Sequence, residues 1–342
     1  MIDPHKSQTG FDRIIGHERP LNMVKAMLAR DRLPHALLIT GPVGIGKYTL
    51  AVALAQAVNC ERPEGGEPCG ICPACGKIER GAHPDVVVLE PEGRTLVIKI
   101  EAVRELRSRV AYHPFEGRTK VFIIRQAERM GNEAANALLK TLEEPPPQSL
   151  ILLTAPEETD LLPTVVSRCL RLGLAPLSRQ LIIDWLRRER DVNESEARLL
   201  ATLAGGCLGR VAEIEPAEMR KKQREIVEKL GSLTASRPRE ALKWAEELAG
   251  AEEERPRFFD LARFWYRDLM ILAAQGGDHH LVHTDYKEEL YRGVRGHGPE
   301  SFIAALKEID DAEEALERMV RPDLVMENLM FNLAQIQEGY NE

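Results

Sequence analysis

The sequence lacks any apolar run that could cross a membrane, since a stretch such as residues 36–39 is far shorter than the roughly 20 residues that a bilayer-spanning helix needs. Its amino-terminal residues, MIDPHK, also lack the apolar core and the small-residue cleavage site of a secretory signal. We therefore expect a cytoplasmic protein that makes no membrane contact.

The chain has no excess of positive charge. Its 46 Lys and Arg residues stand against 54 Asp and Glu residues, which gives a formal net charge of −8. Because binding to phosphates needs clustered cations, this charge excludes a protein whose whole surface coats nucleic acid. Any contact with DNA must be local or shared with partner proteins. Internal repeats and low-complexity tracts are also missing.

Cysteine is scarce, and six cysteines in 342 residues are too few for a disulfide scaffold. Four of them nevertheless cluster, at Cys60, Cys69, Cys72 and Cys75. In a reducing compartment such a cluster indicates a metal site rather than disulfides. Two-residue gaps let the thiolates converge on one ion, and four sulfur ligands predict a closed, structural zinc site. An iron–sulfur cluster and free buried thiols stay open as alternatives.

The length and the residue pattern predict several domains, because single cores stop growing at about 250 to 300 residues. Residues 1–173 alternate short β-rich runs with helical patterns, which is typical of a parallel sheet covered by helices, and the cysteine module at about residues 60–75 is inserted into it. Residues 174–214 indicate a small helical domain, and residues 215–342 indicate a separate all-helical domain.

The apolar runs also predict the individual strands of the α/β domain. The expected strands cover residues 36–40, 86–89, 121–124, 150–154 and 170–172. Apolar residues recur at helical spacing between the second and third of these runs, and again between the third and fourth.

A glycine-rich loop, GPVGIGKYT, follows the first expected strand and precedes a helical pattern, in the order that a Walker A motif requires. Gly41, Gly44 and Gly46 let backbone N–H groups surround phosphate oxygens, and Lys47 supplies a point charge for the outer phosphates. Together with Thr49 these residues form a predicted nucleotide-binding site, with a plain glycine turn as the alternative.

Magnesium binding is not expected at this site. Tyr48 stands where a Ser or Thr hydroxyl usually binds the ion, and Thr49 lies about 100° further around the helix. The strand that should end in catalytic carboxylates continues instead into Arg125 and Gln126. ATP hydrolysis is therefore not expected, although binding of ATP or ADP stays open. A shifted role for Glu128 as the catalytic base is the alternative.

Two further runs complete a recognisable pattern, NALLKTLEEPP at residues 136–146 and SRC at residues 167–169. With the glycine loop and the cysteine module after its helix, they resemble the bacterial clamp-loader subunits of the AAA+ superfamily. The resemblance covers about residues 11–213, and the helical end matches only by pattern. The family includes the ATP-hydrolysing gamma/tau subunit and the delta-prime subunit, whose motifs are often degraded. Tyr48, Arg125 and Gln126 favour the delta-prime type.

The resemblance implies the roles of several residues and domains. Residues 174–214 would be the lid of an AAA+ module, and residues 215–342 a collar that assembles a five-subunit ring. Arg168 matches an arginine finger that projects into the ATP site of a neighbouring subunit, while Thr154 and Arg210 match the family's two nucleotide sensors. The implied partners are gamma/tau and delta subunits, with the sliding clamp and primed DNA within the complex.

Two other functions remain open at this stage. An active ATPase of the gamma/tau kind would hydrolyse ATP as an isolated chain. A metal-binding adaptor of repair or recombination would not associate with clamp-loader subunits.

Overall fold

The computed structural model describes residues 10–93, 96–110, 112–212 and 214–338, and the chain divides into two compact units. The first unit extends to Leu181 and also includes Ala204–Ala212, while the second holds Ile182–Leu203 and the chain from residue 213 onward. The predicted division into three domains stays a prediction. The amino-terminal residues, on which the expected lack of a secretory signal rests, lie outside the described residues.

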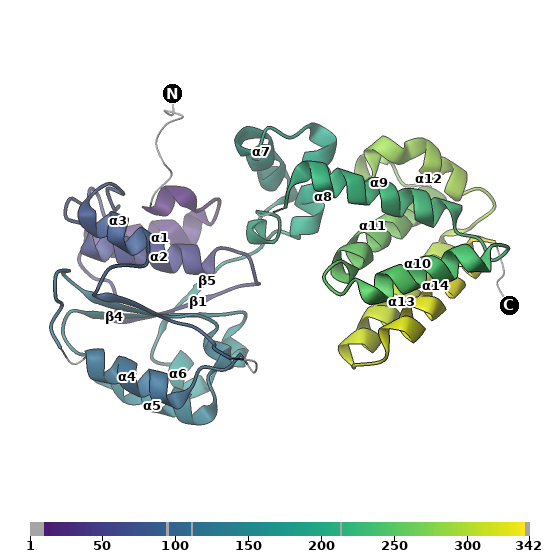
Figure 1. Ribbon diagram of the computed structural model, residues 1–342. Helices are drawn as coiled ribbons and strands as arrows, with labels where there is room; N and C mark the ends of the chain where they lie inside the picture. Colours follow the sequence, from purple (N-terminus) through teal and green to yellow (C-terminus); the bar gives the residue numbers. More distant parts are fainter. Residues whose placement is uncertain (1–9, 94–95, 111, 213, 339–342) are drawn as a thin grey trace. The chain divides into compact units, whose positions relative to one another are not determined.

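The first unit is built on one five-stranded sheet (Figure 1). Its strands are β1 (Ala36–Thr40), β2 (Val86–Leu89), β3 (Lys120–Ile124), β4 (Ser149–Ala155) and β5 (Leu170–Gly173). All neighbouring strands are parallel, in the order β2-β3-β4-β1-β5. Each strand lies within one residue of its predicted bounds at either end, and the predicted α/β class, a parallel sheet flanked by helices, is confirmed.

Helices cover both faces of this sheet, which explains why its strands are apolar at nearly every position. One face packs on α1 (Glu18–Ala29) and α2 (Lys47–Asn59), and the other packs on α4 (Ile100–Val110), α5 (Asn132–Glu143) and α6 (Pro163–Val166) (Figure 1). Side chains of β1 alternate between the two cores, with Leu37 and Ile39 in the first and Leu38 in the second. The sheet is thus fixed from both sides.

The cysteine module lies between α2 and β2 and contains the short helix α3 (Pro73–Glu79). Gln56 of α2 is buried and donates a hydrogen bond from Nε2 to the carbonyl oxygen of Cys75 at 3.2 Å. This bond attaches the module to the helix that follows the glycine loop.

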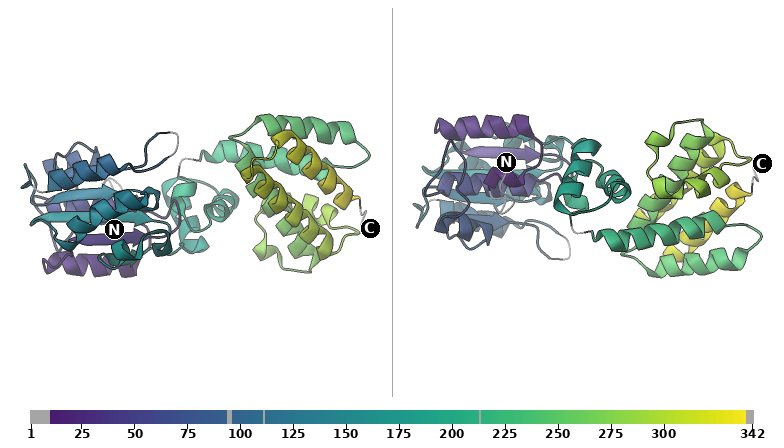
Figure 2. Two further views of the ribbon diagram at one scale, coloured as in Figure 1. Left: turned by 90° about the horizontal axis from the view of Figure 1, so that it is seen from below. Right: turned by 90° about the horizontal axis from the view of Figure 1, so that it is seen from above.

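The second unit contains helices and no strand among its described residues (Figure 2). These helices are α7 (Arg179–Glu189, beginning in the first unit), α8 (Glu194–Ala204), α9 (Pro216–Ser232), α10 (Pro238–Gly250), α11 (Arg255–Ala273), α12 (Lys287–Gly293), α13 (Pro299–Glu317) and α14 (Pro322–Gln337). Trp265 and Tyr266 of α11 and Phe302 of α13 are fully buried. In the described part of the chain, no helix is long and apolar enough to span a bilayer.

Candidate functional site

The glycine loop has a backbone that only glycine adopts without strain. Gly41, Gly44 and Gly46 have φ angles of 142°, 83° and 106°, and α2 begins directly after them. A Cβ atom at Gly41 would lie 2.4 Å from the carbonyl oxygen of Leu174. The sequence therefore folds here into the strand, loop and helix start that can surround phosphate oxygens.

Lys47 points back across the mouth of this loop. Its Nζ donates hydrogen bonds to the carbonyl oxygens of Gly41 at 2.5 Å and Pro42 at 3.0 Å. Burial lowers the pKa of Lys47, and the negative charge of Glu128 opposes that effect. Burial also raises the pKa of Glu128, whose Oε2 accepts no hydrogen bond from any described residue. The ammonium group is thus placed to exchange loop carbonyls for phosphate oxygens.

The residues that replace the expected magnesium ligands contact each other. The guanidinium carbon of Arg125 lies 4.4 Å from the centroid of the Tyr48 ring, a cation–π arrangement. Nη1 of Arg125 also lies 2.6 Å from Oε2 of Glu90, in an ion pair. Thr49 is the next residue of α2 and is half-buried. A cation and an aromatic ring therefore stand where oxygen ligands are needed.

Thr154, the predicted first sensor, lies near the end of β4 and is buried. Its Oγ1 accepts a hydrogen bond from the backbone N–H of Gln126 at 3.1 Å. Gln126, the second residue after β3, has a left-handed backbone, with φ of 51°. The structure thus brings these two predicted residues together at the carboxyl end of the sheet.

Arg210, the predicted second sensor, ends a short 3-10 helix (Leu208–Arg210) that lies against the glycine loop. The N–H of Gly209 donates to the carbonyl oxygen of Gly44 at 2.9 Å, and a Cβ atom at Gly209 would lie 2.8 Å from that oxygen. The side chain of Arg210 is exposed. This close backbone contact places a second cation beside the loop that carries Lys47.

Arg168, the predicted arginine finger, forms an ion pair within its own chain. Its Nη2 lies 2.7 Å from Oε1 of Glu143 in α5, and its Nη1 donates to the carbonyl oxygen of Thr164 at 2.8 Å. The side chain is 34% exposed, and that of Glu143 is 49% exposed. Arg168 thus forms a surface ion pair in this structure, and such a pair is the alternative to the role of an arginine finger.

The four clustered cysteines form one site that could hold a metal ion. Their Sγ atoms all lie within 4.8 Å of one another, and Cys60, Cys72 and Cys75 are buried. The N–H of Cys69 donates to Sγ of Cys60 at 3.2 Å, and the N–H of Cys75 donates to Sγ of Cys72 at 3.5 Å. Burial would raise the pKa of Cys69, but hydrogen bonds from backbone N–H groups outweigh it and lower that pKa to about 7. This donor set fits a thiolate-bound ion.

Two residues that contact the predicted site residues were not identified from the sequence. Glu90 directly follows β2, and Arg125 directly follows β3. Because Leu89 pairs with Ile124 in parallel register, Glu90 and Arg125 meet at the same end of the sheet. Glu143 lies within the run that carries the family resemblance, and it binds Arg168. Strand order would have indicated the first contact, whereas no local signal indicates the second.

Comparisons with known proteins identify relatives of this chain. A family model described as "DNA polymerase III, delta subunit" matches residues 16–178. The delta' subunit of Bacillus subtilis is 30% identical over 94% of this chain and 96% of its own length. A solved gamma-subunit-related protein from Thermotoga maritima covers 93% of this chain and 99% of its own, at 19% identity and a TM-score of 0.49.

Other relatives match only over part of their length. The delta' subunit of Pseudomonas aeruginosa is 36% identical over 58% of this chain and 61% of its own length. The tau subunit of Escherichia coli is 36% identical over 58% of this chain and 31% of its own length. The chain thus spans less than two thirds of these two relatives. The match to the Bacillus subtilis protein extends over nearly the whole of both chains, and this chain therefore belongs to the delta' subunit family of DNA polymerase III.

Proposed function

We propose that this chain acts as a delta'-type subunit of a bacterial clamp loader, in the cytoplasm, in a ring with gamma/tau and delta subunits. In this role it does not hydrolyse ATP itself. It helps the ring to place the sliding clamp on primed DNA. The observation that carries this proposal is the contact between Arg125 and Tyr48 in the position where an active subunit needs magnesium.

Phosphoryl transfer depends on a metal ion that neutralises the developing charge and on a positioned base. Tyr48 offers a phenol on a rigid ring instead of a short hydroxyl, and Arg125 adds a permanent positive charge that repels a divalent cation. The remaining carboxylate, Glu128, is half-buried and lies four residues beyond Ile124, the last residue of β3, instead of at the end of the strand. These features support a subunit without hydrolytic activity and disfavour the gamma/tau alternative.

Nucleotide binding without hydrolysis is the second part of the proposal. The glycine loop is intact, and Lys47 already points its donors into it. With Arg125 and Arg210 near the loop, cations of the chain itself can neutralise a bound diphosphate or triphosphate. We therefore propose that ATP or ADP is held here without a magnesium ion.

Arg168 is proposed to complete the ATP site of a neighbouring subunit. Its pair with Glu143 is partly solvent-exposed, and surface pairs contribute only about 0 to 1 kcal/mol. Exchanging that carboxylate for a phosphoryl group therefore costs little. A guanidinium supplied across an interface stabilises the charge of the transition state. The exposed ion pair is thus compatible with a resting position of the finger.

The cysteine cluster is proposed to bind one structural zinc ion. Four thiol donors leave no open position for water, so the site supports the fold and performs no catalysis. When bound, the ion supplies a fixed crosslink among segments that have little apolar core of their own.

Reconstitution with purified gamma/tau and delta subunits tests the whole proposal. We expect this chain to enter the ring and to be required for full ATP turnover, while the isolated chain turns over no ATP. Turnover by the isolated chain would favour the gamma/tau type, and failure to enter the ring would favour the adaptor.

A further inference from the structure

The loop between α4 and β3 is held from inside by a buried carboxylate. Asp85 lies just before β2, and its oxygens accept hydrogen bonds from the N–H groups of Phe115 at 2.7 Å, Glu116 at 2.8 Å and Gly117 at 2.8 Å. A buried carboxylate is costly unless it is satisfied, so these bonds fix residues 115–117 of the loop.

The cysteine module braces the same loop. Asn59, the residue before Cys60, is buried, and its Oδ1 accepts hydrogen bonds from the next two N–H groups of the loop, at residues 118 and 119, at 2.8 and 2.9 Å. Lys77 of α3 lies 2.8 Å and 2.7 Å from the two carboxylate oxygens of Glu116. Five consecutive backbone N–H groups, of residues 115–119, are thus held by two buried side chains.

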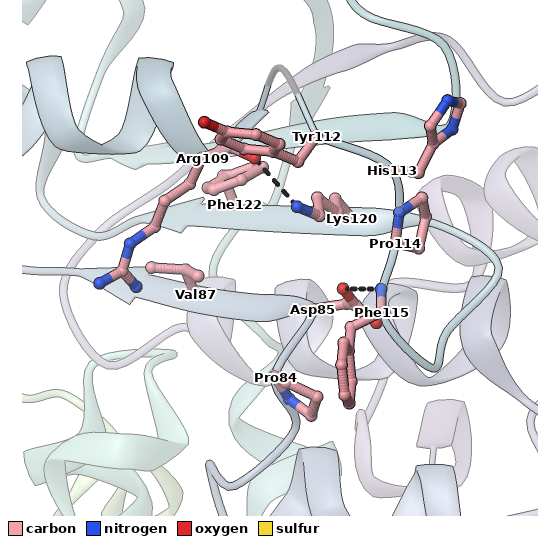
Figure 3. A pocket seen from close by; sticks show the side chains of 10 residues that line it. All are labelled: Pro84, Asp85, Val87, Arg109, Tyr112, His113, Pro114, Phe115, Lys120 and Phe122. Atoms are coloured by element: carbon pink, nitrogen blue, oxygen red, sulfur yellow. Dashed lines mark hydrogen bonds between the residues drawn. The ribbon is translucent and has the colours of Figure 1, made fainter.

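The loop presents two aromatic rings to solvent, and Phe115 belongs to its braced segment. Phe115 is 85% exposed and Tyr112 is 73% exposed. They border a pocket of about 440 Å³ that is lined further in by Phe122 of β3 and Val87 of β2 (Figure 3). Exposed aromatic side chains cost free energy, and beside a pocket on a fixed backbone they are typical of a protein-binding surface.

The rim of the pocket carries two cations, Arg109 and Lys120 (Figure 3). Nη2 of Arg109 lies 2.6 Å from Oε1 of Glu105, in an ion pair, and the lining carboxylate, Asp85, is occupied by the loop N–H groups. Nζ of Lys120 donates to the carbonyl oxygen of Arg109 at 3.0 Å and has no carboxylate partner among the described residues. An ammonium group has three donors, so Lys120 can also bind an anion.

The pocket borders an open strand edge. Val87 belongs to β2, the outermost strand of the sheet, and no described strand pairs with its outer edge. The N–H and C=O groups of such an edge can pair with an extended peptide.

We propose that the pocket and the edge of β2 bind an extended acidic segment of a partner protein, which adds to the sheet as a strand and inserts one apolar side chain between Tyr112 and Phe115. An acidic peptide complements the cationic rim, and its backbone can use the strand edge. A nucleic acid has no backbone amides for that edge, and the net charge of −8 opposes it elsewhere on the surface. The pocket lies at the amino ends of β2 and β3, whereas the glycine loop follows the carboxyl end of β1, so this inference is independent of the nucleotide site.

Fluorescence anisotropy with the full chain tests the proposal. The probe is a labelled short peptide that carries one Phe among Asp and Glu residues, and saturable binding is expected. Phe115→Ala should weaken it about tenfold, the effect of losing one anchoring contact of about 1.4 kcal/mol. Ile303→Ala is the control, because Ile303 is a 55% exposed apolar residue of α13 in the second unit, and it should change nothing.

Charge and metal dependence sharpen the test. Lys120→Gln removes the positive charge but keeps a donor for the carbonyl oxygen of Arg109. It should weaken binding of the acidic peptide, but not binding of a peptide in which Asn and Gln replace Asp and Glu. Removal of the metal by a chelator should also weaken binding of the acidic peptide, since the cysteine module braces the loop between α4 and β3. No saturable binding of the acidic probe, or tighter binding of an oligothymidylate that depends on Phe115, would overturn the proposal.

Discussion

The guanidinium carbon of Arg125 lies 4.4 Å from the centroid of the Tyr48 ring, and this contact joins the two residues that replace the expected magnesium ligands. Each substitution alone weakens a metal site. Their contact also fills it with a cation, which the ion pair with Glu90 holds in position. At the proposed nucleotide site, a cation therefore occupies the place of the missing magnesium ligands.

Nucleotide binding is expected to be independent of divalent cations. Calorimetric titration with ADP should give the same affinity in magnesium and in EDTA, because Lys47 and Arg125 neutralise the phosphates. The double variant Tyr48→Thr, Arg125→Asp restores a hydroxyl and a carboxylate, so its affinity should depend on magnesium. Lys47→Ala, the control for binding at this loop, should lose about tenfold to 100-fold in affinity. A loss of wild-type affinity in EDTA would contradict the assignment.

Arg168→Ala is expected to slow ATP turnover in the assembled loader by about 10³-fold at the site that this residue faces, because a transition-state cation is lost. Circular dichroism should show an unchanged subunit, since the lost ion pair is exposed. Arg168→Lys should restore turnover only in part, because an ammonium lacks the planar fork of a guanidinium. Glu143→Gln is the matched control and should leave turnover at or above the wild-type rate. Equal turnover with Arg168→Ala would argue that the ion pair is the whole role of this residue.

The metal site is expected to yield a colourless protein with one equivalent of zinc by elemental analysis. Visible absorbance would support an iron–sulfur cluster instead. Cys72→Ser should lower both the metal content and the melting temperature, because the ion is proposed to crosslink the module. Cys169→Ser is the control: burial raises the pKa of that thiol to about 12, so it stays protonated, and the metal content should not change.

Local patterns predicted the scaffold well, because the strands are continuous apolar runs and the glycine loop and cysteine cluster are contiguous in sequence. Ala36–Thr40 and Val86–Leu89 were predicted with their observed bounds. Contacts between distant segments were not predictable in this way. The pair of Arg125 and Glu90 depends on β2 lying beside β3, and the support of the loop after α4 by Asp85 depends on the same strand order.

Asp85 is expected to make the stability of the first unit depend on pH. Burial would raise the pKa of Asp85, but three backbone N–H donors outweigh it, so the pKa in the folded state is lowered. An ionised Asp85 therefore stabilises the folded state at pH values above the pKa of the unfolded state, about 3.9. That stabilisation is lost as the pH falls through the lower pKa of the folded state.

Urea unfolding at several pH values measures this effect directly. At neutral pH Asp85→Asn should reduce the free energy of unfolding by about 2 kcal/mol, because an amide replaces a charged acceptor of three hydrogen bonds. The difference from the wild type should shrink as the pH falls below about 3.9, where the unfolded carboxylate takes up a proton, and it should be lost below the lower pKa of the folded state. Hydrogen exchange should show faster exchange of the amides of residues 115–117 in the variant. A difference that stays constant from neutral to acidic pH would mean that the ionised carboxylate does not hold this loop.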